Sequence, residues 1–229
     1  MLGAVARIEE FARTGKPAHV VTLGAEMANL AYVDPTYRAA VNAADLVVAD
    51  TIGIVMASRL LGKPLRERVA GIDLLGRLCE RAAALGHPVF LLGGASGVAD
   101  EAAAALRVRH PDLRIAGSHH GYFADDASAA VCALIRNSSA RIVFVGLGFP
   151  RQEYWIRENI GKLGAVVCIG VGGSFDVISG RLTRAPAAVR KAGLEWLYRL
   201  VTEPRRLRRQ LALPAFALRS MYQALFGPR

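Results

Sequence analysis

The segment Arg141-Ile-Val-Phe-Val-Gly-Leu-Gly-Phe-Pro150 sets the fold class of this chain. Its first half is almost continuously apolar, as is typical of a parallel strand that is buried on both faces. Two glycines and a proline end the apolar run, and a helical pattern follows at residues 151–160. The segment therefore predicts one strand–turn–helix unit of an α/β protein.

Short apolar runs alternate with helical patterns along most of the chain. We predict strands at residues 19–23, 46–49, 88–92, 113–117, 141–145 and 165–171. We predict helices at residues 51–61, 72–85, 98–109, 126–137 and 151–160. This alternation predicts a Rossmann-like, doubly wound α/β fold whose mainly parallel sheet binds ligands at the carboxyl ends of its strands.

The pattern changes after about residue 182. Residues 191–209 read as helix, turn and helix and are rich in arginine, and residues 211–226 are mostly apolar. We therefore expect an α/β domain over residues 1–190 and a helical, arginine-rich C-terminal appendage over residues 191–229. An exposed apolar tail favours self-association, so a homo-oligomer remains open.

The chain is strongly basic, since 29 lysines and arginines against 19 acidic residues give a formal net charge of +10. Such a surface attracts nucleic acid, anionic lipid or phosphorylated substrates. The arginines of the appendage lack interleaved aromatic side chains for base stacking, so we expect no nucleic-acid partner. Arg199, Arg206 and Arg209 have the spacing of one helical face and suit a diphosphate, with a solvated basic face as the alternative.

Cysteine usage and the absence of long apolar runs indicate the compartment. Cys79, Cys132 and Cys168 are far apart, so we expect buried free thiols in a reducing environment. The first residues have no pattern of a signal peptide, and no run reaches about 18 uninterrupted apolar residues. We expect a cytoplasmic protein.

Glycines follow the predicted strands, where a ligand would bind. Gly93, Gly94 and Gly97 separate the strand at 88–92 from the next helix, and free amides at a helix start can hold a phosphate. A tight turn is an equally good interpretation. The segment lacks the dinucleotide fingerprint, so we expect no cofactor.

Two polar residues at strand ends are candidates for chemistry. Asp50 follows the strand at 46–49 and could act as a general base, although a helix-capping aspartate is the common alternative. Gln152 follows the second glycine-rich turn and could bind a ligand, or belong to an ordinary helix start. His119 and His120 lack a third ligand at zinc spacing, so we expect no metal.

Together these segments resemble the WecG/TagA/CpsF family of glycosyltransferases between residues 20 and 209. The matching stretches are Val21-Thr-Leu23, Ala44-Asp-Leu-Val-Val-Ala-Asp50, Arg68-Val-Ala-Gly-Ile-Asp73, Gly93-Gly-Ala-Ser-Gly97, His119-His-Gly-Tyr-Phe123, Val145-Gly-Leu-Gly-Phe-Pro-Arg-Gln-Glu153, Gly170-Val-Gly-Gly-Ser-Phe-Asp176, Arg184-Ala-Pro186 and Gly193-Leu-Glu-Trp-Leu-Tyr-Arg-Leu200. The family usually has Thr-x-Asn at the first strand end, whereas this chain has Gly24 in the third position.

The resemblance implies an inverting, metal-independent transfer of an N-acetylmannosamine-type sugar from UDP to a polyprenyl-diphosphate-linked sugar, at the inner face of the cell membrane. It implies that Asp50 is the base on the acceptor hydroxyl. It also implies a set of substrate-binding residues, in which the last three face the donor diphosphate: Thr22, Arg68, Gly93, Gly94, Gly97, Gln152, Asp176, Arg199, Arg206 and Arg209. The alternatives are a non-catalytic, membrane-associated nucleotide-binding module and a dinucleotide-dependent oxidoreductase.

Overall fold

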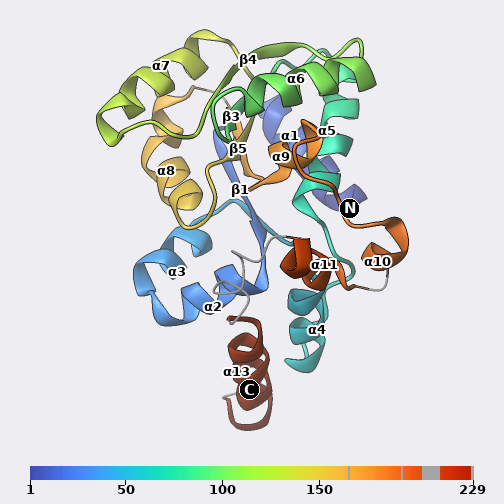
Figure 1. Cartoon of the computed structure of the whole chain (residues 1–229). Coiled ribbons are helices and arrows are strands. Elements are labelled where there is room, and N and C mark those ends of the chain that lie inside the picture. Colours follow the sequence, from blue (N-terminus) through green and yellow to red (C-terminus); the bar gives the residue numbers. More distant parts are fainter. Residues whose placement is uncertain (165, 192, 203–211, 228–229) are drawn as a thin grey trace.

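A computed structural model describes residues 1–164, 166–191, 193–202 and 212–227 (Figure 1). Within these residues one sheet has the strand order β2-β1-β6-β5-β3-β4, and every pair of neighbours is parallel. The strands are β1 (Ala18–Leu23), β2 (Leu46–Ala49), β3 (Val89–Gly93), β4 (Ile115–His119), β5 (Ile142–Gly146) and β6 (Val167–Gly170). The predicted α/β fold is confirmed, with a sheet that is parallel throughout.

Helices cover both faces of this sheet (Figure 1). They are α1 (Leu2–Thr14), α2 (Ala25–Val33), α3 (Pro35–Asn42), α4 (Ile52–Leu60), α5 (Gly71–Leu85), α6 (Val98–Arg109), α7 (Ser128–Asn137), α8 (Arg151–Asn159), α9 (Ser174–Ile178), α10 (Ala187–Lys191), α11 (Glu195–Thr202) and α13 (Ala212–Phe226). Successive residues of β3 show the two layers. Leu91 packs in the core formed with α1, α5, α6 and α9, whereas Phe90 packs in the core formed with α7 and α8.

The chain leaves the neighbouring strands β1 and β6 toward opposite faces. After β1 it enters α2 and α3, whose Tyr37 packs with Val21. After β6 it enters α9, whose Phe175 packs with Val20 in the opposite layer. Two strands that diverge in this way leave a crevice at their carboxyl ends, which is where open α/β sheets bind ligands.

Every predicted strand overlaps an observed one, and the ends differ by at most three residues. The helices α2 and α3 were not predicted. They form because Asp34 ends the first and its side chain accepts hydrogen bonds from the amides of Thr36 and Tyr37 at the start of the second. All three cysteines are free and buried, as predicted.

The appendage is seen in part. The helix α11 agrees with the helical pattern predicted from residue 191, and α10 ends at that residue. Residues 203–211, which hold most of the arginines of the appendage, lie outside the described residues. The helix α13 packs on α2 and α4, and Arg219 lies over the ring of Tyr32. A domain division at residue 190 remains a prediction.

His19 on β1 is a buried titratable group. It is 5% exposed, and its amide donates a 2.9 Å hydrogen bond to the Asp45 carboxylate. Burial lowers the pKa of its imidazole from 6.5 to about 4, and the charge of Asp45 opposes this shift only in part. The folded protein therefore holds His19 neutral in the pH range in which the unfolded chain protonates it.

We expect His19→Leu to remove part of the acid sensitivity of the fold. Because the folded pKa lies below the unfolded value, His19 costs no stability above pH 6.5, and the cost grows as the pH falls toward 4. Between these values the wild type should lose up to about 3 kcal/mol of unfolding free energy that the variant keeps. Urea unfolding of both proteins at several pH values measures the difference, and parallel pH profiles would contradict the assignment.

Candidate functional site

The carboxyl ends of five strands form one continuous edge. Thr22 on β1 donates from Oγ1 to the carbonyl of Gly170 at the end of β6, at 2.7 Å. Gly93 at the end of β3 lies so close to Gly146 of β5 that a Cβ there would come within 2.4 Å of its backbone. Asp50 directly follows β2. The edge that the sequence predicted as a ligand site is therefore assembled from these strand ends.

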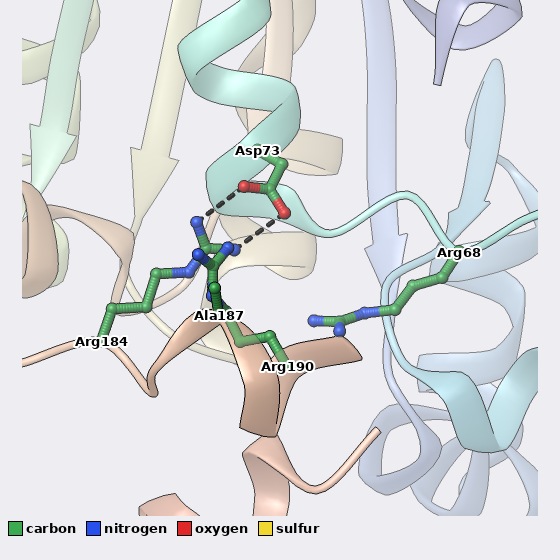
Figure 2. Close-up of a pocket in the computed structure, with 5 residues that line it drawn as sticks. All are labelled: Arg68, Asp73, Arg184, Ala187 and Arg190. Carbon is green, nitrogen blue, oxygen red and sulfur yellow. Dashed lines mark hydrogen bonds and ion pairs between the residues drawn. The ribbon is translucent and has the colours of Figure 1, made fainter. Parts of the chain in front are cut away.

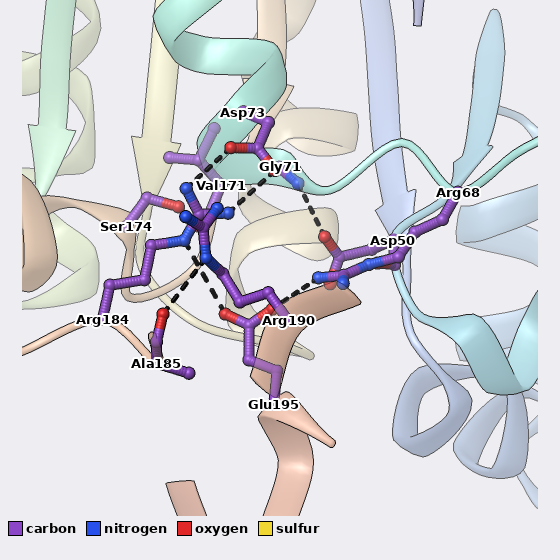
Figure 3. Close-up of polar contacts among 10 residues, drawn as sticks. All are labelled: Asp50, Arg68, Gly71, Asp73, Val171, Ser174, Arg184, Ala185, Arg190 and Glu195. Carbon is purple, nitrogen blue, oxygen red and sulfur yellow. Dashed lines mark hydrogen bonds and ion pairs between the residues drawn. The ribbon is translucent and has the colours of Figure 1, made fainter. Parts of the chain in front are cut away.

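Asp50 does not cap the helix that follows it. Thr51 is the N-cap residue of α4, whereas the Asp50 carboxylate accepts a 2.6 Å hydrogen bond from the amide of Gly71, the first residue of α5 (Figure 3). The positive end of the α5 dipole stabilises negative charge at this point. The carboxylate is thus fixed at the strand edge by a second helix, and the capping alternative for α4 is wrong.

Gly71 leaves room for this arrangement. A Cβ at this position would lie 3.3 Å from the Thr22 hydroxyl, which is tighter than an ordinary contact. The glycine therefore lets the start of α5 approach β1 closely. Thr22 and Asp50 come together because both border Gly71.

Arg68 contacts both Asp50 and the appendage. Its Nε donates to the Asp50 carbonyl at 2.6 Å, and its Nη2 donates to the carboxylate of Glu195, the first residue of α11, at 2.7 Å (Figure 3). These contacts place Arg68 between Asp50 and the start of α11. A role in substrate binding remains a prediction.

A second arginine, Arg184, links the segment after α9 to α5 through hydrogen bonds. Arg184 binds both oxygens of Asp73 at 2.7 and 2.8 Å, and its Nε lies 3.9 Å from the other Glu195 oxygen. These hydrogen bonds hold the pKa of the Asp73 carboxyl below its ordinary value, and the charges of Arg184, Arg190 and Arg68 act in the same direction. The Asp73 carboxylate is therefore ionised at neutral pH.

These side chains border a cavity of about 210 Å³ (Figure 2). We call it the arginine pocket, and it is lined by Arg68, Asp73, Arg184, Ala187 and Arg190. Figure 2 shows that its guanidinium groups come from the loop before α5, the segment before α10 and α10 itself. Sequence reasoning missed Asp73, Arg184 and Arg190, although two of them lie in the quoted Arg68–Asp73 and Arg184–Pro186 stretches.

Gln152 is buried beneath the crevice and is 2% exposed. Its Nε2 donates to Glu153 at 2.6 Å, and its Oε1 accepts from the amide of Gly172 at 3.1 Å. The amide thus holds the turn between β6 and α9 in place. The structure therefore indicates that Gln152 stabilises the backbone at the strand edge. Direct ligand binding by Gln152 remains a prediction.

Glu153, the residue after Gln152 on α8, is a buried carboxyl that was not singled out from the sequence. It is fully buried and receives hydrogen bonds from Gln152 and from the Tyr37 hydroxyl. Burial raises the pKa of Glu153 and that of Tyr37. The only local signal for this group was its position three residues after a proline, which is shared by many surface glutamates.

The glycine turn after β3 has clear structural causes. Gly93, Gly94 and Gly97 all have positive φ, and Gly94 donates to the carbonyl of Gly146. Gly97 is the N-cap residue of α6 and lies near Arg181. These contacts support the tight-turn interpretation, and phosphate binding there remains a prediction.

The remaining predicted residues are placed only in part. Asp176 lies on α9, which packs against α6. The backbone of Arg199 lies in α11, and Arg206 and Arg209 lie outside the described residues. In the described ranges no three His, Cys, Asp or Glu side chains gather in a metal-binding arrangement.

Comparisons with known proteins agree with this geometry. A family model described as "Glycosyl transferase WecG/TagA/CpsF family" matches residues 1–229. A relative from Bacillus spizizenii is 40% identical over 201 residues, which cover 88% of this chain and 77% of that protein. A relative from Staphylococcus aureus is 38% identical over 198 residues, with 86% and 77% covered. Both are named N-acetylglucosaminyldiphosphoundecaprenol N-acetyl-beta-D-mannosaminyltransferase.

We expect Gln152→Leu to destabilise the fold by about 2–4 kcal/mol. The change removes the partner of one oxygen of the buried Glu153 carboxyl and the partner of the Gly172 amide, and each such unsatisfied group costs on the order of 1–3 kcal/mol. Urea unfolding measures the loss. The control is Arg157→Leu, on the exposed side of the same helix. Equal stability of the two variants would show that Gln152 does not hold this turn.

Proposed function

The chain belongs to the WecG/TagA/CpsF family of glycosyltransferases, and we propose that it transfers N-acetylmannosamine from UDP to undecaprenyl-diphosphate-linked N-acetylglucosamine. This acceptor and this sugar are those in the names of its relatives. The product would be an intermediate of teichoic acid or another cell-surface polysaccharide. The observation that carries the proposal is the Asp50 carboxylate at the carboxyl edge of the sheet, held by the Gly71 amide beside Arg68.

The proposed reaction is a single displacement. A hydroxyl of the acceptor sugar attacks the anomeric carbon of the donor while Asp50 accepts its proton. The bond from that carbon to the UDP oxygen breaks, and UDP leaves with its electron pair. Attack opposite to the leaving group inverts the configuration. The hydrogen bond from Gly71 fixes the base before the substrates arrive, so little reorganisation is needed.

The leaving diphosphate needs positive charge as the bond breaks. In the proposal this charge comes from arginines and helix amides, and no metal ion is required. Support comes from the formal net charge of +10. By family resemblance Arg199, Arg206 and Arg209 face the donor diphosphate, with Thr22, Gln152 and Asp176 in the same cleft.

The helix α13 supports a peripheral contact with the inner face of the membrane. Its exposed apolar side chains follow a helical stripe and are each at least half exposed: Leu218, Met221, Tyr222, Leu225 and Phe226. In the described part of the chain, none of the helices has both the length and the apolar character to cross a bilayer. We therefore propose that this stripe lies in the membrane interface, with self-association as the competing use of the same surface.

We expect Asp50→Asn to lower kcat by about 10²–10⁴-fold with little change in UDP affinity, because only proton acceptance is lost. The assay uses a short-chain lipid-diphosphate-GlcNAc and a panel of UDP-sugars, with and without EDTA, and detects the product by mass. Calorimetry measures UDP binding. Asp112→Asn, an exposed aspartate, is the control. Near-normal turnover by the Asp50 variant would rule this residue out as the base.

We expect the double change Leu225→Glu and Phe226→Glu to weaken binding to anionic vesicles at least 10-fold. Each apolar side chain contributes roughly 1.5–3 kcal/mol when it is buried, and both would be replaced by charge of the same sign as the lipid. Vesicle sedimentation measures the effect. Val108→Glu, an exposed apolar position on α6, is the matched control. Unchanged vesicle binding with a shifted oligomeric state would instead assign the stripe to self-association.

A further inference from the structure

The arginine pocket contains more positive charge than its own residues neutralise. Its lining carries three guanidinium groups and one carboxylate, that of Asp73, so two positive charges remain. Asp73 engages Arg184 through both oxygens. The Nε of Arg190 donates to the Ala185 carbonyl at 3.1 Å, and its terminal nitrogens have no hydrogen-bond partner among the described residues. The pocket therefore has donors available for an anion.

A carboxylate from the appendage sits at the border of this pocket. One oxygen of Glu195 accepts from Arg68 at 2.7 Å, and the other lies 3.9 Å from the Nε of Arg184 (Figure 3). This Nε is buried and has no hydrogen bond. A carboxylate that bridges two guanidinium groups occupies the position that suits phosphate oxygens equally well. A diphosphate diester, with two negative charges, matches the charge that the lining leaves over.

Exposed apolar side chains lie next to Glu195, at the border of the arginine pocket. Leu194, Trp196 and Leu197 next to Glu195 are each more than 40% exposed, and Ile52 of α4 is 39% exposed. Gly193 packs near Ile52, which brings the start of α11 to α4. A charged pocket beside exposed apolar side chains fits a ligand with a diphosphate head and a hydrocarbon chain. A nucleoside diphosphate has no hydrocarbon chain to place against these side chains.

We propose that the arginine pocket binds the diphosphate of the polyprenyl-linked acceptor and that Glu195 occupies this place until the acceptor displaces it. The inference rests on the proposed function and names a subsite of it. Arg68 contacts both Asp50 and Glu195, so a diphosphate in the pocket brings the attached sugar close to the base. The donor diphosphate then lies elsewhere along the strand edge.

The first test is Arg190→Gln, with Arg77→Gln on the exposed side of α5 as the control for loss of one charge. Direct binding is measured for three probes: a short-chain prenyl-diphosphate-GlcNAc, UDP and inorganic diphosphate. We expect the Kd and the KM for the prenyl probe to rise roughly 10- to 100-fold, as for the loss of hydrogen bonds to a charged group, and the Kd for UDP to change less than about twofold. Thermal melting checks that both variants fold.

The direct binding measurements distinguish a failure of this inference from a failure of the proposed function. If the wild type transfers no sugar but binds the prenyl probe through Arg190, the pocket assignment stands and the reaction assignment fails. If transfer occurs and Arg190→Gln leaves the prenyl Kd unchanged, the pocket assignment is overturned. An equal loss of UDP affinity would assign the pocket to the donor and overturns it as well.

The second test is Glu195→Gln, which removes the competing charge while keeping the side-chain shape. We expect the Kd for the prenyl probe to fall about 3- to 10-fold and the Kd for UDP to stay constant. A purely anchoring Glu195 predicts the opposite, since a loosened α11 would weaken binding of the probe. An unchanged or higher prenyl Kd in this variant therefore overturns the displacement.

Discussion

The hydrogen bond from the Gly71 amide to the Asp50 carboxylate is the constraint on which the candidate site depends. It joins the end of β2 to the start of α5 across the loop that carries Arg68. A glycine favours this contact, because a Cβ at position 71 would lie only 3.3 Å from the Thr22 hydroxyl on the neighbouring strand. Three segments that are separate in the sequence thereby fix one carboxylate at the carboxyl edge of the sheet, beside β1.

Much of the fold was predictable because buried parallel strands leave a local signal. Residues 142–145, for instance, are apolar throughout, and each predicted run overlaps a strand. The ends were less predictable. Leu113, for instance, is apolar and buried but lies in the turn before β4. The pair α2 and α3 was missed since each is short and a side-chain cap at Asp34, followed by Pro35, divides the pattern.

The site was predictable only where it follows directly from a strand end. Asp50 was found in this way, whereas Thr22 was indicated only by the family resemblance, and the structure places both beside Gly71. The partners of Arg184 were not, because Asp73 lies 111 residues away and only the folded chain brings the two together. Gln152 had a local signal for a ligand contact, but a buried amide that supports a turn produces the same signal.

The packing position of α13 has a consequence for how the protein would sit on a membrane. This helix packs on α2 and α4, the two helices that directly follow Thr22 on β1 and Asp50 on β2. A bilayer that holds its apolar stripe would set the height of the candidate site above the lipid head groups. The protein would then select acceptors whose reactive hydroxyl lies at the matching distance from the membrane plane.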